Sequence, residues 1–168
     1  MVSHPHRRLL TTPLFFTENE DDPLCKINLP RFPSLRHLNI FKCQVWHHSI
    51  LGLPIPSFPS SICQLLNLRG STSDIQTMYI SVTYGGVEPG TERQILHPSL
   101  GWADFDTILA DENYRALKLI KLEFEIEFTR WHHTPRSGLF EIKSLVDGLF
   151  PAVNASGRVR MDIDVMLS

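Results

Sequence analysis

The chain has 168 residues, of which 42% are hydrophobic and 20% are charged, and its formal net charge is −2. This length predicts one domain, and the composition is ordinary for a soluble protein. The small net charge excludes a strong global attraction to nucleic acid or to an anionic membrane. Because the sequence has no run of about 18 apolar residues, it predicts no membrane-spanning helix.

The N-terminal segment and the cysteines bear on the cellular compartment. Arg7 and Arg8 are not followed by a long apolar stretch with a cleavage site, so we expect no secretory signal. The sequence has three cysteines, Cys25, Cys43 and Cys63. An odd number of widely spaced cysteines does not indicate a disulfide framework. Cys43 and Cys63 are expected to be buried, unreactive thiols. We therefore expect an intracellular protein, either cytoplasmic or nuclear.

In chain order, residues 1–28 have no clear hydrophobic period and are expected to form an irregular lead to a domain at residues 29–168. That domain opens at residues 35–43 with the spacing LxxLxLxxC, which is typical of the strand in a leucine-rich repeat. Similar strand patterns recur along the chain at intervals of about 40 residues. The apolar positions are Leu35, Leu38, Ile40 and Cys43; Ile75, Met78, Ile80 and Val82; Leu117, Ile120, Leu122 and Phe124; and Val159, Met161, Ile163 and Val165.

The clearest of these segments is residues 120–128, where apolar and charged side chains alternate strictly. Because successive side chains of a strand point to opposite faces, this alternation predicts a half-buried strand. Ile120, Leu122, Phe124 and Ile126 are the predicted core residues.

Helical patterns lie between the predicted strands, at residues 59–68, 101–112 and 139–150, and Pro151 is expected to stop the last helix. Residues 85–90 are expected to form a loop, because they contain three glycines and a proline. Strands joined by return helices are parallel, with right-handed connections. The predicted fold class is α/β, an irregular leucine-rich-repeat-like solenoid fragment with about four parallel strands and crossover helices. The alternative is an ordinary α/β domain whose strands are evenly spaced.

The two ends of this predicted sheet differ in their protection. The last strand has the outward charges Arg158, Arg160, Asp162 and Asp164, which protect an edge strand against unwanted pairing. The strand at residues 35–43 follows a proline-rich lead, and we expect it to lack such protection. We expect it to be the vulnerable end, with faster amide hydrogen exchange than residues 120–128.

The C-terminal half resembles the C-terminal region of the leucine-rich-repeat-like, F-box-associated proteins of mushroom-forming (basidiomycete) fungi. The resemblance covers roughly residues 29–165 and is strongest from Gly101. It implies an interaction module behind an F-box, the segment that recruits a substrate receptor into a ubiquitin ligase. Residues 1–29 are too short and too polar for an F-box, so a ligase-adaptor role is expected only if an F-box lies upstream in a longer form. The matching residues are Trp102, Asp104, Phe105, Asp106, Tyr114, Leu117, Phe150, Pro151, Val153, Gly157 and Val159.

Catalytic, metal and cofactor motifs are missing from the sequence. It has no GxSxG, HExxH, GxxxxGK[ST], GxGxxG, CxxC or HxxxH pattern. The histidine pairs at residues 47–48 and 132–133 are expected in surface loops, as is the basic cluster at residues 130–136. The carboxylates of Asp104, Asp106 and Glu112 are expected to stabilise a helix N-terminus. We therefore expect a non-catalytic protein without cofactors or bound metal.

The outward side chains of the strands are the better lead, because in a stacked repeat they form one continuous surface. We interpret this surface as a face for a protein partner, with no nucleic acid or membrane involved. The alternative is a solvated face with cross-strand ion pairs from Glu123 or Glu125 to Arg158 or Arg160. Two other hypotheses remain: a small enzyme with a site near the loop between Gly85 and Gly90, and a truncated gene product without independent function. The candidate partner-binding residues are Lys121, Glu123, Glu125, Glu127, Arg158, Arg160 and Asp162.

Overall fold

The structure, a computed structural model, describes residues 10–13, 27–32, 34–46, 60–68, 70–88, 90–99, 101–128 and 136–168. In these residues one sheet has the order β1-β2-β3-β4-β5, and every neighbouring pair of strands is parallel. The parallel order expected from the recurring strand patterns is therefore confirmed. The strands are β1 (Leu10–Pro13), β2 (His37–Trp46), β3 (Thr77–Val87), β4 (Leu119–Phe128) and β5 (Arg160–Leu167).

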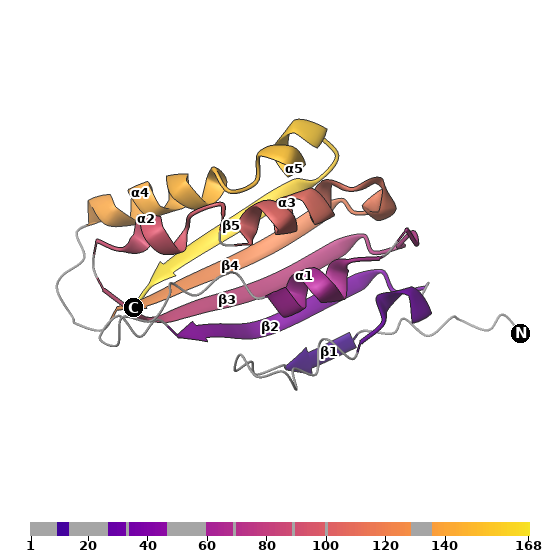
Figure 1. Cartoon of the computed structure of the whole chain (residues 1–168), viewed down its shortest axis with the longest axis horizontal. Coiled ribbons are helices and arrows are strands. Elements are labelled where there is room, and N and C mark those ends of the chain that lie inside the picture. The colour runs from indigo at the N-terminus through magenta and orange to yellow at the C-terminus, as the bar shows by residue number, and fades with distance from the viewer. Residues whose placement is uncertain are drawn as a thin grey trace, which may run out of the picture.

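The described helices cover one face of this sheet (Figure 1). A right-handed connection that always steps to the next strand in the same direction returns on the same side each time, so consecutive helices collect on one face. No described helix covers the opposite face. The helical elements are η2 (Leu29–Arg31), α1 (Ser60–Leu66), α2 (Glu92–Ile95), α3 (Trp102–Ala110), η4 (Glu112–Tyr114), α4 (Arg136–Asp147) and α5 (Pro151–Ser156).

The core lies between the sheet and these helices, and both β3 and β4 contribute buried side chains to it. Ile120, Leu122, Phe124 and Ile126 are buried on the helix side, as the alternation predicts. Phe124 stacks on Tyr84 with ring centroids 5.4 Å apart and lies 5.5 Å from the ring of Trp102. Such aromatic contacts add to the stabilisation that comes from buried apolar area.

The N-terminal end of the sheet differs from the prediction, which had about four strands and an exposed strand at residues 35–43. Leu10–Pro13 forms a further strand, β1, which pairs with residues 38–41 of β2. The four residues of β1 end in a proline and show no alternation of apolar and polar side chains. The formation of this strand therefore depends on its pairing with β2. β2 is therefore an inner strand over those residues and not the edge we expected.

Two local expectations are also wrong. Residues 85–90 do not begin as a loop, because β3 continues to Val87, which pairs with Phe128 after a register shift. Gly86 has φ 74° at this irregularity, a left-handed conformation that favours glycine. Pro151 does not simply stop a helix: α4 ends at Asp147, and Pro151 opens α5, where its fixed φ suits the first turn.

The described residues contain no helix that is both long enough and apolar enough to cross a membrane.

Candidate functional site

The helix-free face of the sheet is lined by the polar side chains that alternate with the core residues. Parallel pairing places these side chains in rows across β3, β4 and β5. One row holds Tyr79, Lys121 and Asp162, and the next holds Ser81, Glu123 and Asp164. A third row holds Thr83, Glu125 and Met166. We call these nine residues the open face.

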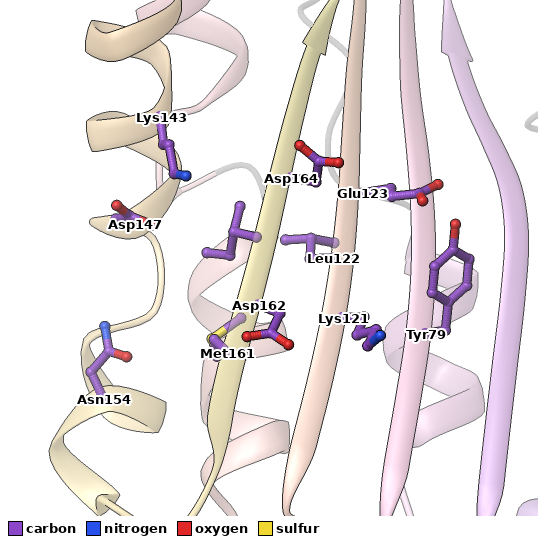
Figure 2. Close-up of a pocket in the computed structure, with 11 residues that line it drawn as sticks. Tyr79, Lys121, Leu122, Glu123, Lys143, Asp147, Asn154, Met161, Asp162 and Asp164 are labelled. Atoms are coloured by element: carbon purple, nitrogen blue, oxygen red, sulfur yellow. The ribbon is translucent and has the colours of Figure 1, made fainter.

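A groove of about 670 Å³ crosses the open face and passes over the edge of β5 to α4 and α5 (Figure 2). Its floor is formed by β3, β4 and β5, and Lys143, Asp147 and Asn154 stand on its far side, on the two helices. The groove is shallow and open to solvent, which suits a macromolecular partner better than an enclosed small molecule. Its lining residues are Tyr79, Lys121, Leu122, Glu123, Lys143, Asp147, Asn154, Met161, Asp162, Ile163 and Asp164.

Two acidic residues occupy neighbouring strands in the middle of this face. Glu123 of β4 is the register partner of Asp164 of β5, so two negative charges occupy neighbouring strands. Like charges directly opposite on paired strands are destabilising. In the neighbouring row, the register partners Lys121 and Asp162 have opposite charges. We call these two neighbouring carboxylates the negative centre of the open face.

Tyr79 borders this negative centre from β3. Its pKa is raised first by burial, then by a hydrogen bond to the Glu123 carboxylate and by the charges of Glu123 and Asp164. The phenol therefore stays protonated in the physiological range and acts as a donor to Glu123. This bond fixes the position of the Glu123 carboxylate on the open face.

Most of the candidate residues predicted from the sequence share this face. Lys121, Glu123, Glu125 and Glu127 alternate with the core residues of β4. Glu125 accepts hydrogen bonds from Thr83 Oγ1 at 3.3 Å and from Ser168 Oγ at 3.4 Å.

On β5, Arg160 and Asp162 also alternate with the core side. They form an ion pair within their own strand, with Arg160 Nη2 2.9 Å from Asp162 Oδ1. The register sets Arg160 beside Leu119, and not beside Glu123 or Glu125, with which the alternative interpretation paired it.

Arg158 lies elsewhere, in the bend that precedes β5. Its Nη2 donates to the carbonyl oxygens of Ala110 at 2.6 Å and Asp111 at 3.3 Å. Arg158 therefore satisfies carbonyls at the C-terminal end of α3, where a cation is favourable. Arg158 was included among the candidate residues as an outward side chain of the last strand, but that strand begins at Arg160, so Arg158 precedes it.

Sequence reasoning missed part of the candidate site. Tyr79, and Asp164 with its outward charge on the last strand, were not included among the candidate partner-binding residues. Their register with Lys121 and Glu123 makes them part of it. Lys143, Asp147 and Asn154 carry no strand signal, and only the packing of α4 and α5 beside β5 brings them to the groove.

Some of the other candidate groups lie outside the described residues, and none of the described ones belongs to a possible metal site. The histidine pairs at residues 47–48 and 132–133, and also Cys25, lie outside the described residues. Cys63 is partly buried, and burial, followed by the nearby charge of Asp104, raises the pKa of its thiol to about 11. Within the described ranges, no three His, Cys, Asp or Glu side chains are grouped so that they could hold a metal ion.

Asp106 is buried and has a role different from the one expected. Its Oδ2 accepts the N–H of Ala152 at 2.8 Å and its Oδ1 that of Val153 at 2.9 Å. It thus caps α5, not its own helix α3.

Comparisons with protein-family models, with curated proteins and with solved structures find no match to this chain.

Proposed function

We propose that this chain is a non-catalytic protein-interaction module that binds a protein partner on the open face. The observation that carries the proposal is the arrangement of the sheet: consecutive parallel strands leave one face free of described helices, and that face holds the Glu123–Asp164 pair at its centre. Two adjacent carboxylates reduce stability in the free chain, and a partner with a positive group would remove that cost.

We also propose that the fold is an irregular leucine-rich-repeat-like solenoid. Register partners Leu38, Met78, Ile120 and Met161 recur at intervals of 40, 42 and 41 residues. A repeat architecture requires such a near-constant interval.

The backbone bonds that open the strands recur in the same way. Gln76 N donates to Arg36 O, Lys118 N to Gln76 O, and Arg160 N to Lys118 O, at distances of 2.8 to 2.9 Å. Equivalent bonds at equivalent positions support the repeat interpretation.

The residues behind the resemblance to fungal F-box-associated proteins are consistent with a shared packing pattern. Trp102, Phe105, Asp106, Tyr114 and Phe150 are all buried. Tyr114 also connects neighbouring units, because its hydroxyl donates to Leu66 O at 2.5 Å. We propose that the module acts as an intracellular substrate-recognition unit, and as a ubiquitin-ligase adaptor only where an F-box lies upstream in a longer form.

A double charge reversal tests the proposed partner surface. In cells that naturally produce the chain, tagged wild-type protein is compared with Glu123→Lys/Asp164→Lys. The variant keeps two like charges opposite each other, so the electrostatic cost within the sheet is similar. Asp104→Lys/Glu112→Lys is the matched control, since both of these carboxylates are exposed on the helix side.

We expect the open-face variant to lose a partner that wild-type protein and the control retain, with all three chains equally folded by circular dichroism. A partner that all three chains retain equally, or that only the control loses, would place the binding surface elsewhere. If wild-type protein, the open-face variant and the control all convert one small molecule at the same rate, the protein is an enzyme, and the non-catalytic part of the proposal is refuted.

A further inference from the structure

The outer edge of β5 has main-chain groups that the described residues do not pair. Arg160 N donates to Lys118 O, and Ser168 N donates to Ile126 O, so the even-numbered residues of this strand turn their peptide groups toward β4. Backbone groups alternate along a strand. The N–H and C=O groups of Met161, Ile163 and Val165 therefore point away from the sheet.

The same strand is incompletely covered on its helix side. Met161 and Ile163 are half-buried, whereas their register partners on β4, Ile120 and Leu122, are 0% and 1% exposed. The exposed part of these apolar side chains lines the groove. Figure 2 shows Met161 across from Asn154 of α5. Free main-chain groups and exposed apolar area thus occur together along one edge.

The charges beside this edge determine which kind of added strand could bind there. Asp162 and Asp164 alternate with the outward-pointing backbone groups, and Asp162 is already paired with Arg160. Asp164 has the like-charged Glu123 as its neighbour on β4. A strand placed beside β5 on its other side would set a side chain next to Asp164, where a lysine or arginine is favoured.

A second copy of this chain fits the edge less well. A copy related by a two-fold axis would pair antiparallel, and pairing centred on Ile163 would set Asp162 opposite Asp164, which is destabilising. β5 itself contains no proline, the residue that would most simply block pairing at its edge, so its edge is open to a strand of another protein.

We propose that the edge of β5 binds an extended, basic–apolar segment of a partner protein as an added parallel strand. Main-chain bonds to Met161, Ile163 and Val165 supply affinity. Apolar side chains of the segment cover Met161 and Ile163, and its lysine or arginine side chains lie beside Asp164. This binding mode shares Asp164 with the open face, but it otherwise depends on outward backbone groups of β5 and not on side chains of β3 and β4.

The probe is a synthetic peptide of about seven residues that alternates valine and lysine, the length of a typical strand. Two control peptides accompany it: one with glutamate in place of lysine, and one with N-methyl groups on alternate residues, which removes the N–H groups from one edge. Binding is measured by isothermal titration, and amide exchange of β5 is followed by NMR on the full chain.

We expect the lysine peptide to slow exchange of the amides of Met161, Ile163 and Val165. N-methylation should weaken binding by roughly tenfold or more, because main-chain bonds dominate this mode. The glutamate peptide should not bind measurably. Equal binding of the methylated peptide, no binding of the lysine peptide at millimolar concentration, or protection that appears with protein concentration alone would each overturn the proposal.

A variant of the protein gives an independent test. Met161→Pro removes one outward N–H while the bonds to β4 remain, and Met161→Ala removes only the side chain. We expect the proline variant to bind the lysine peptide several-fold more weakly than the alanine variant, and equal affinity would contradict strand addition. If this test fails while Glu123→Lys/Asp164→Lys still loses the natural partner, the edge proposal falls and the open-face proposal stands.

Discussion

Asp106 of α3 accepts the backbone N–H of Val153 of α5 at 2.9 Å, across 47 positions of sequence. The carboxylate is 3% exposed and also accepts the N–H of Ala152, so one side chain satisfies two donors at the start of another helix. Unpaired donors at a buried helix N-terminus are costly. One buried acid thus connects two consecutive helical units.

Replacement of this carboxylate should destabilise the chain. We expect Asp106→Ala to lower the free energy of unfolding by about 1–3 kcal/mol, because two N–H groups lose their acceptor. Chemical denaturation measures the change. Asp104→Ala, at an exposed position of the same helix, should have a much smaller effect, and equal effects of the two substitutions would refute the capping role.

The aromatic cluster around β4 gives the second prediction. Phe124→Ala should lower the free energy of unfolding by about 3–5 kcal/mol, because it empties a fully buried site between Tyr84 and Trp102. Urea denaturation with Lys121→Ala as the exposed control on the same strand measures the difference. A loss below about 1 kcal/mol would mean that the opposite face of β4 is the buried one.

These two sites show how far the sequence alone leads. The alternation at residues 120–128 is sufficient to predict β4 and its buried face, because the two-residue period of a strand is a local property of the sequence. The role of Asp106 cannot be predicted from the sequence, because the N–H groups that it accepts belong to α5, which lies beside α3 only in the folded chain. β1 and the extension of β3 through Gly85 and Gly86 were missed for the same reason: each is imposed by a neighbouring strand.

The candidate site follows the same division. Alternation predicted that Lys121, Glu123 and Asp162 point away from the core, and the structure confirms it. Which residues become neighbours depends on register. The apolar positions aligned in the sequence set Ile120 opposite Met161 and Leu122 opposite Ile163, and the structure has this register, which places Glu123 beside Asp164. The spacing does not show where the last strand begins, and its start at Arg160 leaves Arg158 in the preceding bend.

The like-charged pair on the open face yields the third prediction. Asp164→Asn should raise the free energy of unfolding by about 0.2–1 kcal/mol, because it removes the repulsion from Glu123. High salt should shrink this gain, since screening weakens the repulsion in the wild type as well. Thermal unfolding at low and high ionic strength measures both effects.

Asp162→Asn is the matched control for that substitution, because Asp162 has Arg160 as its partner. It should leave stability unchanged or slightly lower, as expected for an exposed ion pair. If Asp164→Asn destabilises the chain at low salt, the negative centre is compensated by some other group and the argument for a positive partner group fails.

The thiol of Cys63 gives a prediction about pH. Burial, followed by the charge of Asp104, raises its pKa from 9.0 to about 11, so the folded state holds the proton more tightly than the unfolded state. At pH 8 the thiolate fraction is roughly 100-fold lower than for a free thiol, and alkylation should be slower in proportion. The rate should rise as the pH approaches 11.

Mass spectrometry of the labelled Cys63 peptide, in native buffer and in urea, measures this difference. Asp104→Asn should raise the native rate only modestly, because the carboxylate is the smaller of the two causes. A native rate equal to the rate in urea would show that the thiol is solvated and reactive.

Site-specific photo-cross-linking tests the proposed partner face most directly. A photoreactive amino acid replaces Ser81, which lies beside Glu123 on the open face, or Thr107, which is exposed on α3. In cells that naturally produce the chain, we predict a discrete adduct from position 81 that disappears in the Glu123→Lys/Asp164→Lys background, and no such adduct from position 107. An adduct from position 107 alone, or one from position 81 that survives the charge reversal, would contradict a partner-binding role for the open face.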